Sequence, residues 1–202
     1  MATNGIQIQK IGDIITRRIR LQGLRPIMFD RYAGDNRTKL TVEQRLYLDP
    51  STRAIGLPAI NILSVLTAHT TNSAPKRLRD AKVYKSICNA CLSFVEIGPE
   101  FVPILGEGGR PVIFGKLDAH GIDAKSGIYT HYAVGRLKNG IPNPKERPTL
   151  PLPWAMEFDL AIFPNKEIRE QELVNLFVDG GRSIGLGTFR GAFGKFEVVS
   201  WN

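Results

Sequence analysis

The segment that most constrains the fold of this chain is the run 154–163, in which large apolar residues alternate with small or charged ones. The large apolar positions are Trp154, Met156, Phe158, Leu160 and Ile162. Because successive side chains of a β-strand point to opposite faces of a sheet, this pattern predicts a strand with one face in the core and the other on a more polar side. We therefore expect the core of this protein to be built on a sheet.

The other periodic segments give an order of strands and helices along the chain. Helices are expected at 58–69, at 76–90 and at 167–178, where Asp179-Gly180-Gly181 is expected to end the helix. Strands are expected at 14–29, 93–97, 128–137 and 193–201, with a hairpin formed by 101–105 and 111–117. This order is the βαββαβ rhythm of a ferredoxin-like (RRM-like) fold, an antiparallel sheet of the α+β class with loop insertions. We expect one domain over 1–202, with an inserted loop region at 118–153.

Two shorter signals refine this expectation. Thr41 precedes Gln44 by three residues, the spacing of a capping box, and predicts the start of a short helix. The stretch 138–153 carries five prolines, which lack the backbone N–H that helices and sheets use. It is expected to hold neither a helix nor a central strand, and to form a semi-rigid excursion.

Charge is the main compositional clue to function. The chain has 27 Lys and Arg against 19 Asp and Glu, a net charge of +8, while 43% of its residues are hydrophobic. A folded protein with this basic excess favours polyanionic partners. The first residues resemble no signal peptide, and no run approaches about 20 apolar residues. With only Cys88 and Cys91, no disulfide framework is expected, so the simplest expectation is a cytoplasmic protein with no membrane partner.

A glycine-rich segment, 179–195, is the most distinctive stretch of the chain. Its glycines are Gly180, Gly181, Gly185, Gly187, Gly191 and Gly194. Glycines allow a backbone to approach a phosphate closely, and Arg182, Arg190 and Lys195 bring positive charge to the same place. The alternative is a turn that lets a helix and a strand pack closely. The segment is neither a Walker loop nor a dinucleotide-binding fingerprint, because it follows a helix and leads into a strand.

A glycine-rich loop between the last helix and the last strand of a ferredoxin-like domain resembles the RAMP superfamily of CRISPR-associated proteins. Two further segments, Arg20–Pro26 and Ile55–Leu66, are similar to the first strand and the first buried helix of its crRNA-binding backbone subunits. The resemblance implies that the chain binds crRNA-like RNA as a repeated subunit of a ribonucleoprotein. It implies contacts with the phosphate backbone that do not read the sequence.

The partner expected from charge and resemblance together is single-stranded RNA, with DNA as an alternative, and the chain is expected to form a homo-oligomer or to join a larger complex. No cofactor or metal is predicted, because no standard ligand spacing is found. The residues predicted to bind nucleic acid are Arg18, Arg20, Lys76, Arg77, Arg79, Gly181, Arg182, Gly185, Gly187, Arg190 and Lys195.

Two other functions stay open from the sequence. Some relatives in the superfamily cleave target RNA with an acidic residue after the first strand, so Asp30 or Asp35 could serve a metal-dependent ribonuclease. Acidic residues in loops are also common turn formers, and the sequence favours a binding protein over an enzyme. The third function is a structural or assembly protein of a phage, in which the glycine-rich segment packs against a neighbouring subunit.

Overall fold

The computed structural model describes residues 12–35, 37–68, 73–136 and 142–202, and these form an α+β protein with two antiparallel sheets. The larger sheet has the strand order β3-β5-β8-β1-β9, and β4 pairs with β8 beyond the end of β5. Its strands are β1 (Ile15–Gly23), β3 (Gly56–Pro58), β4 (Val95–Gly98), β5 (Phe101–Leu105), β8 (Ala155–Ile162) and β9 (Phe196–Trp201). The expected α+β class is therefore confirmed.

The alternating segment becomes β8, next to β1 in the sheet. Met156, Phe158, Leu160 and Ile162 are buried, as the alternation predicts. In the antiparallel register, Ile19 of β1 lies opposite Phe158, and both side chains belong to the core. The helices therefore pack against the apolar faces of β1 and β8.

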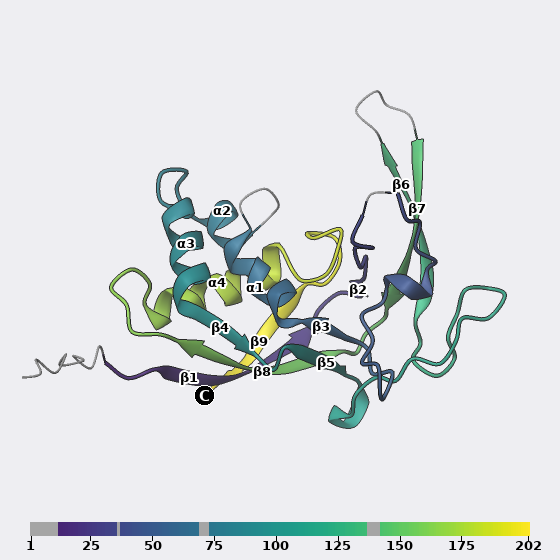
Figure 1. Ribbon diagram of the computed structural model, residues 1–202, viewed down its shortest axis with the longest axis horizontal. Coiled ribbons are helices and arrows are strands. Elements are labelled where there is room, and N and C mark those ends of the chain that lie inside the picture. Colours follow the sequence, from purple (N-terminus) through teal and green to yellow (C-terminus); the bar gives the residue numbers. More distant parts are fainter. Residues whose placement is uncertain (1–11, 36, 69–72, 137–141) are drawn as a thin grey trace, which may run out of the picture.

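Four helices lie on one side of the larger sheet (Figure 1). They are α1 (Ala59–Thr67), α2 (Ala74–Leu78), α3 (Tyr84–Phe94) and α4 (Glu170–Ser183). The single helix expected at 76–90 is wrong, because a turn divides it into α2 and α3. Asp80 accepts a hydrogen bond from the backbone N–H of Lys82 in that turn, and Arg79 is extended. No helix in the described part of the chain is long and apolar enough to cross a membrane.

The strand expected over 14–29 is divided by a short break. β1 ends at Gly23, where a Cβ would lie closer than 3.0 Å to the indole atoms of Trp154, so only glycine fits there. The chain resumes as β2 (Ile27–Met28), which belongs to the second sheet, of order β2-β7-β6. The hairpin expected at 101–117 has only its first strand, β5; the second run forms isolated bridges and follows a short 3-10 helix, η2 (Glu107–Gly109).

The proline-rich stretch forms a central strand, which corrects the expectation of an irregular excursion. β7 (Pro142–Leu150) pairs with β6 (Tyr129–Arg136) on one side and with β2 on the other. Pro144 and Pro148 occupy alternate positions, so their missing N–H groups fall on the same edge. The carbonyl of Pro148 accepts a hydrogen bond from the N–H of Phe29, which shows that this edge faces β2, where pairing is short. The prolines therefore remove no hydrogen-bond donor from the other edge of β7, which pairs with β6.

Candidate nucleic-acid interface

α4 continues through the two glycines that were expected to end it. A Cβ on Gly181 would lie 2.6 Å from the ring of Phe196, and one on Gly180 would lie 2.8 Å from Ala74. These glycines therefore let α4 approach β9 and α2 closely, and the predicted helix end is wrong by a turn. Gly181 is buried inside α4, so its backbone N–H is used within the helix.

The segment that follows, residues 185–194, is the glycine-rich loop, and three of its glycines are packed against other backbone. Gly185, Gly187 and Gly194 all have positive φ angles, which L side chains adopt only with strain. A Cβ on Gly185 would lie 2.6 Å from the carbonyl of Gly194, and one on Gly187 would lie under 3.0 Å from the Met28 oxygen. Close packing of chain on chain, the alternative that the sequence left open, accounts for these glycines.

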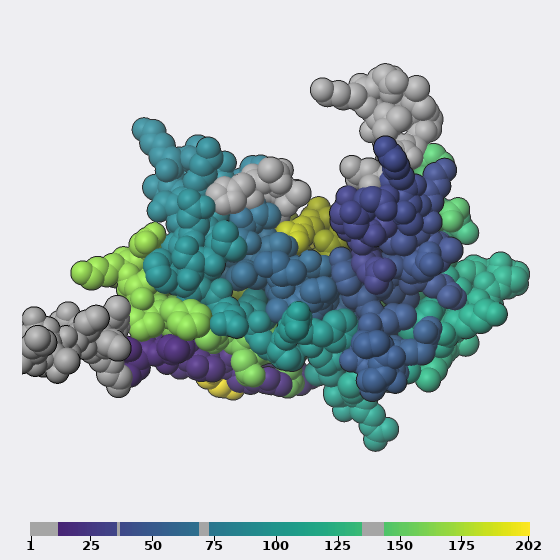
Figure 2. Space-filling model, in the orientation of Figure 1, coloured from purple at the N-terminus to yellow at the C-terminus, as the bar shows by residue number. Residues whose placement is uncertain are grey.

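Hydrogen bonds and ring contacts fix the loop to three other elements. The N–H of Thr188 donates to Met28 at 2.9 Å, which attaches the loop to β2. The ring of Phe193 lies 5.1 Å from that of His131 on β6, edge to face. Figure 2 shows the loop, in yellow, at the bottom of a hollow between the helices on the left and the segment after β2 on the right. The sequence could not show that β2 and β6 meet this loop.

Arg190 makes the third attachment, to α1. Its guanidinium donates to the carbonyl of Ser64 at 3.4 Å and to that of Gly187 at 3.3 Å, and it also contacts the Ser64 hydroxyl. Burial lowers the pKa of Arg190. The side chain thus holds the loop against the helix, a contact that the predicted role of phosphate ligand did not include.

Arg18 and Arg20 lie on the face of the larger sheet that points away from the helices. Each stands opposite a carboxylate of β8 in the register of the two strands. Arg18 donates to Asp159 at 3.0 Å, and Arg20 forms an ion pair with Glu157. Their positive charge is therefore largely balanced within the sheet.

Among the other predicted cations, one is paired with a carboxylate and, within the described chain, four are not. Arg79 is paired with Glu172 of α4 at 2.7 Å. Over the part of the chain that the structure describes, Lys76, Arg77, Arg182 and Lys195 form no ion pair, and Arg182 is exposed at the end of α4.

Lys76, Arg77 and Lys195 lie on segments that pack along α4, Arg182 lies in its last turn, and a fifth cation lies beside Lys195. α2, which carries Lys76 and Arg77, meets α4 where Ala74 packs on Gly180. The carbonyl of Lys195 accepts the N–H groups of Leu24 and Arg25, so the exposed Arg25 is a neighbour that sequence reasoning missed. We call Arg25, Lys76, Arg77, Arg182 and Lys195 the α4-end cations.

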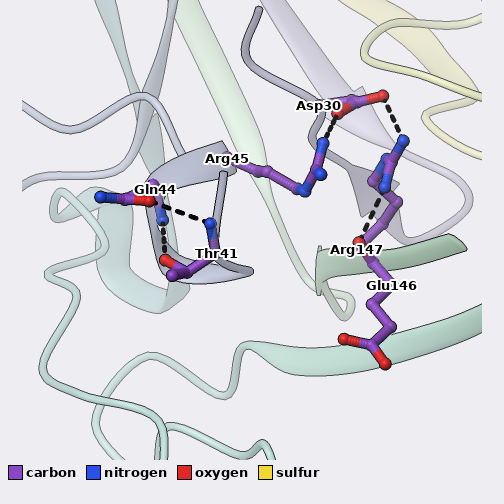
Figure 3. Close-up of polar contacts among 6 residues, drawn as sticks. All are labelled: Asp30, Thr41, Gln44, Arg45, Glu146 and Arg147. Atoms are coloured by element: carbon purple, nitrogen blue, oxygen red, sulfur yellow. Dashed lines mark hydrogen bonds and ion pairs between the residues drawn. The ribbon is translucent and has the colours of Figure 1, made fainter. Parts of the chain in front are cut away.

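The two acidic candidates are held in structural contacts. Asp30 accepts from Arg45 at 2.6 Å and forms an ion pair with Arg147 at 2.8 Å, and Figure 3 shows the three side chains converging. Two guanidiniums on one carboxylate oppose the binding of a cation there. Asp35 caps a turn, and the Thr38 hydroxyl and neighbouring N–H groups lower its pKa. No group of three or more His, Cys, Asp or Glu that could hold a metal occurs among the described residues.

Comparison with known proteins places the fold. No protein-family model matches the chain, and no curated protein matches its sequence. Among solved structures, a chain of the structure described as "Cryo-EM structure of the Type III-B Cmr-beta bound to cognate target RNA" superposes with a TM-score of 0.55 at 9% sequence identity. The match covers 94% of this chain and 60% of that chain. At this identity the likeness is one of fold, and this chain spans less than two thirds of its neighbour's length.

Proposed function

We propose that this protein binds single-stranded RNA as a subunit of a ribonucleoprotein, as a RAMP-like protein gripping the phosphate backbone. The observation that carries the proposal is the fold likeness over 94% of the chain to a chain of an RNA-bound type III-B Cmr-beta structure. The net charge of +8 agrees with a polyanionic partner. The strand order β9-β1-β8, followed by β4 and β5, supports the ferredoxin-like assignment, with 118–153 as an insertion.

The α4-end cations are the surface that we assign to the RNA backbone. Lys and Arg without a carboxylate partner can exchange solvent counterions for phosphates, which is the main source of sequence-independent affinity. Arg18 and Arg20 would first have to leave Asp159 and Glu157, so their contribution to RNA binding is expected to be smaller.

Fluorescence anisotropy with a labelled single-stranded RNA about 30 nucleotides long tests this assignment. The double variant Arg182→Ala/Lys195→Ala is compared with Arg18→Ala/Arg20→Ala, which changes the net charge equally. We expect the first variant to weaken binding for all sequences and to reduce the slope of log K against log salt by about 1.4, because each lost single-strand phosphate contact contributes about 0.7. Equal losses of RNA affinity in both variants would mean that only net charge matters, and that the α4-end cations are not a specific surface. Failure of the native protein to bind RNA would refute the proposed function.

A titration with single-stranded DNA of the same sequence decides between the two nucleic acids. RNA affinity above DNA affinity would indicate contacts with the 2′-hydroxyl. Light scattering with and without RNA tests the subunit role: we propose that assembly beyond the monomer depends on RNA. Salt-insensitive oligomers that form without nucleic acid would favour an assembly protein instead.

A further inference from the structure

A second cationic site lies apart from the α4-end cations, between the short 3-10 helix η1 (Glu43–Arg45) and β7. It is a pocket of about 480 Å³, open to solvent. Its walls include four cationic residues: Lys39, Arg45, Lys145 and Arg147. Pockets of this size accept small molecules and nucleotides.

The charges around this pocket do not balance. Arg45 and Arg147 share the single carboxylate of Asp30. Lys39 and Lys145 form no ion pair among the residues that the structure describes. Glu146 also borders the pocket, but Figure 3 shows its side chain extending away from Asp30 and the two guanidiniums. The site therefore carries more positive than negative charge.

Hydrogen-bond donors at the site also lack acceptors. The side chain of Arg147 is only 8% exposed, yet its Nε has no hydrogen-bond partner among the residues that the structure describes. Arg45 uses Nη1 on Asp30, and within the described chain its other guanidinium nitrogens make no hydrogen bond. The remaining donors of Arg45 border the pocket, so a bound ligand rich in acceptor oxygens would satisfy them.

The backbone that carries Arg45 is held by a reciprocal pair of hydrogen bonds. The N–H of Thr41 donates to the side-chain oxygen of Gln44 at 2.9 Å, and the N–H of Gln44 donates to the Thr41 hydroxyl at 3.3 Å (Figure 3). This is the capping box that the sequence predicts. It fixes η1, so Arg45 is positioned before a ligand arrives.

We propose that this pocket binds one phosphate group, carried by a nucleotide or by the end of an RNA strand. Phosphate offers several acceptor oxygens and matches the planar donors of arginine, while the two lysines add charge at the rim. The site is independent of the proposed grip on the RNA backbone, because it uses none of the α4-end cations.

Isothermal titration of the whole protein with inorganic phosphate and AMP, and with adenosine as the uncharged comparison, tests the site. We expect phosphate and AMP to bind and adenosine to bind far more weakly. Lys39→Ala/Lys145→Ala should weaken AMP binding by roughly tenfold or more, the effect of losing charge-assisted hydrogen bonds. The matched control is Lys82→Ala/Lys166→Ala, which removes two exposed lysines elsewhere. Equal weakening in the control variant would overturn the proposal. So would heats of phosphate and AMP binding no larger than those of a chloride titration at the same ionic strength.

Asp30→Asn gives an independent test, because it releases both guanidiniums from their carboxylate. The proposal expects tighter phosphate binding and a larger rise of Tm with phosphate than in the native protein. If this variant binds phosphate no better while still folded, the site is wrong.

Two RNA oligonucleotides, one with a 5′-phosphate and one with a 5′-hydroxyl, distinguish the sources of the phosphate. A preference for the phosphorylated strand that Lys39→Ala/Lys145→Ala abolishes assigns the site to strand ends. Equal binding of both strands, with AMP binding still lost in that variant, assigns it to free nucleotides. Failure of the RNA-backbone proposal would leave AMP binding unchanged, so the two proposals fail separately.

Discussion

Substituting Gly187 separates the two roles that the glycine-rich loop could have. If glycines are needed for a phosphate to approach the backbone, an added methyl group should lower RNA affinity and leave stability almost unchanged. The structure favours packing, because a Cβ at Gly187 would lie under 3.0 Å from the Met28 oxygen. Gly191 is the matched control, since it also has positive φ but its Cβ would meet nothing nearer than Ser183 O at 4.0 Å.

The two costs can be separated by comparing these variants. A left-handed backbone costs an alanine about 1–2 kcal/mol in either position. Forcing a methyl group into packed backbone adds about 1–3 kcal/mol, so Gly187→Ala should lose about 2–5 kcal/mol of the free energy of unfolding. Gly191→Ala should lose only the conformational part, about 1–2 kcal/mol.

Urea unfolding followed by tryptophan fluorescence measures both losses, because Trp154 is fully buried and Trp201 is partly buried. RNA anisotropy on the same samples, under conditions where both variants are folded, measures affinity. Equal stability losses in Gly187→Ala and Gly191→Ala would refute the packing argument. A Gly187→Ala variant of native stability with lost RNA affinity would restore the phosphate-approach role.

Three further predictions concern groups other than the α4-end cations. Hydrogen bonds from Ser51 and Thr52 lower the pKa of Asp49 to about 2. The stabilising effect of its carboxylate should therefore be present above about pH 4 and lost as pH falls toward 2. A carboxyl NMR titration and acid unfolding of Asp49→Asn would check this. Burial raises the pKa of Cys91 to about 12, and burial also raises the pKa of Cys88 above its ordinary value. A thiol reagent at pH 8 should therefore label both cysteines only after unfolding, and rapid labelling of the native protein would contradict the structure. Arg190→Ala should lower the free energy of unfolding by about 1–3 kcal/mol, because it removes the hydrogen bonds to α1. Unchanged stability in urea would show that these hydrogen bonds do not stabilise the loop.

The elements with strong periodicity could be predicted from the sequence, and those set by tertiary contacts could not. The alternation of Met156 and its neighbours predicts β8 because one face of that strand is buried along its length and the other is more exposed. Pro144 and Pro148 argue against a central strand by composition, yet alternate spacing places their missing donors on one edge. Gly180 and Gly181 read as a helix end, since the sequence does not show that Ala74 and Phe196 press against them.

The candidate site shows the same division between residue type and residue placement. The sequence indicates that Arg182 and Lys195 lie by a glycine-rich loop, and the structure keeps them free of ion pairs in the described chain. Arg25 was missed because its neighbour, Lys195, is far away in sequence. Arg190 was predicted as a phosphate ligand, whereas its contact with Ser64 becomes visible only when α1 is placed against the loop.

The outward face of the sheet can be compared with the way RRM domains bind RNA. RRM domains stack bases on aromatic side chains of their sheet. Here the outward positions of β1 and β8 pair Arg18 with Asp159 and Arg20 with Glu157, and Gln22 lies opposite Ala155. Since none of these positions is aromatic and their charges compensate, the two central strands offer neither a stacking platform nor a net positive surface. The α4-end cations, which form no ion pair in the described chain, lie outside these two strands, and in our proposal they hold phosphates without reading bases.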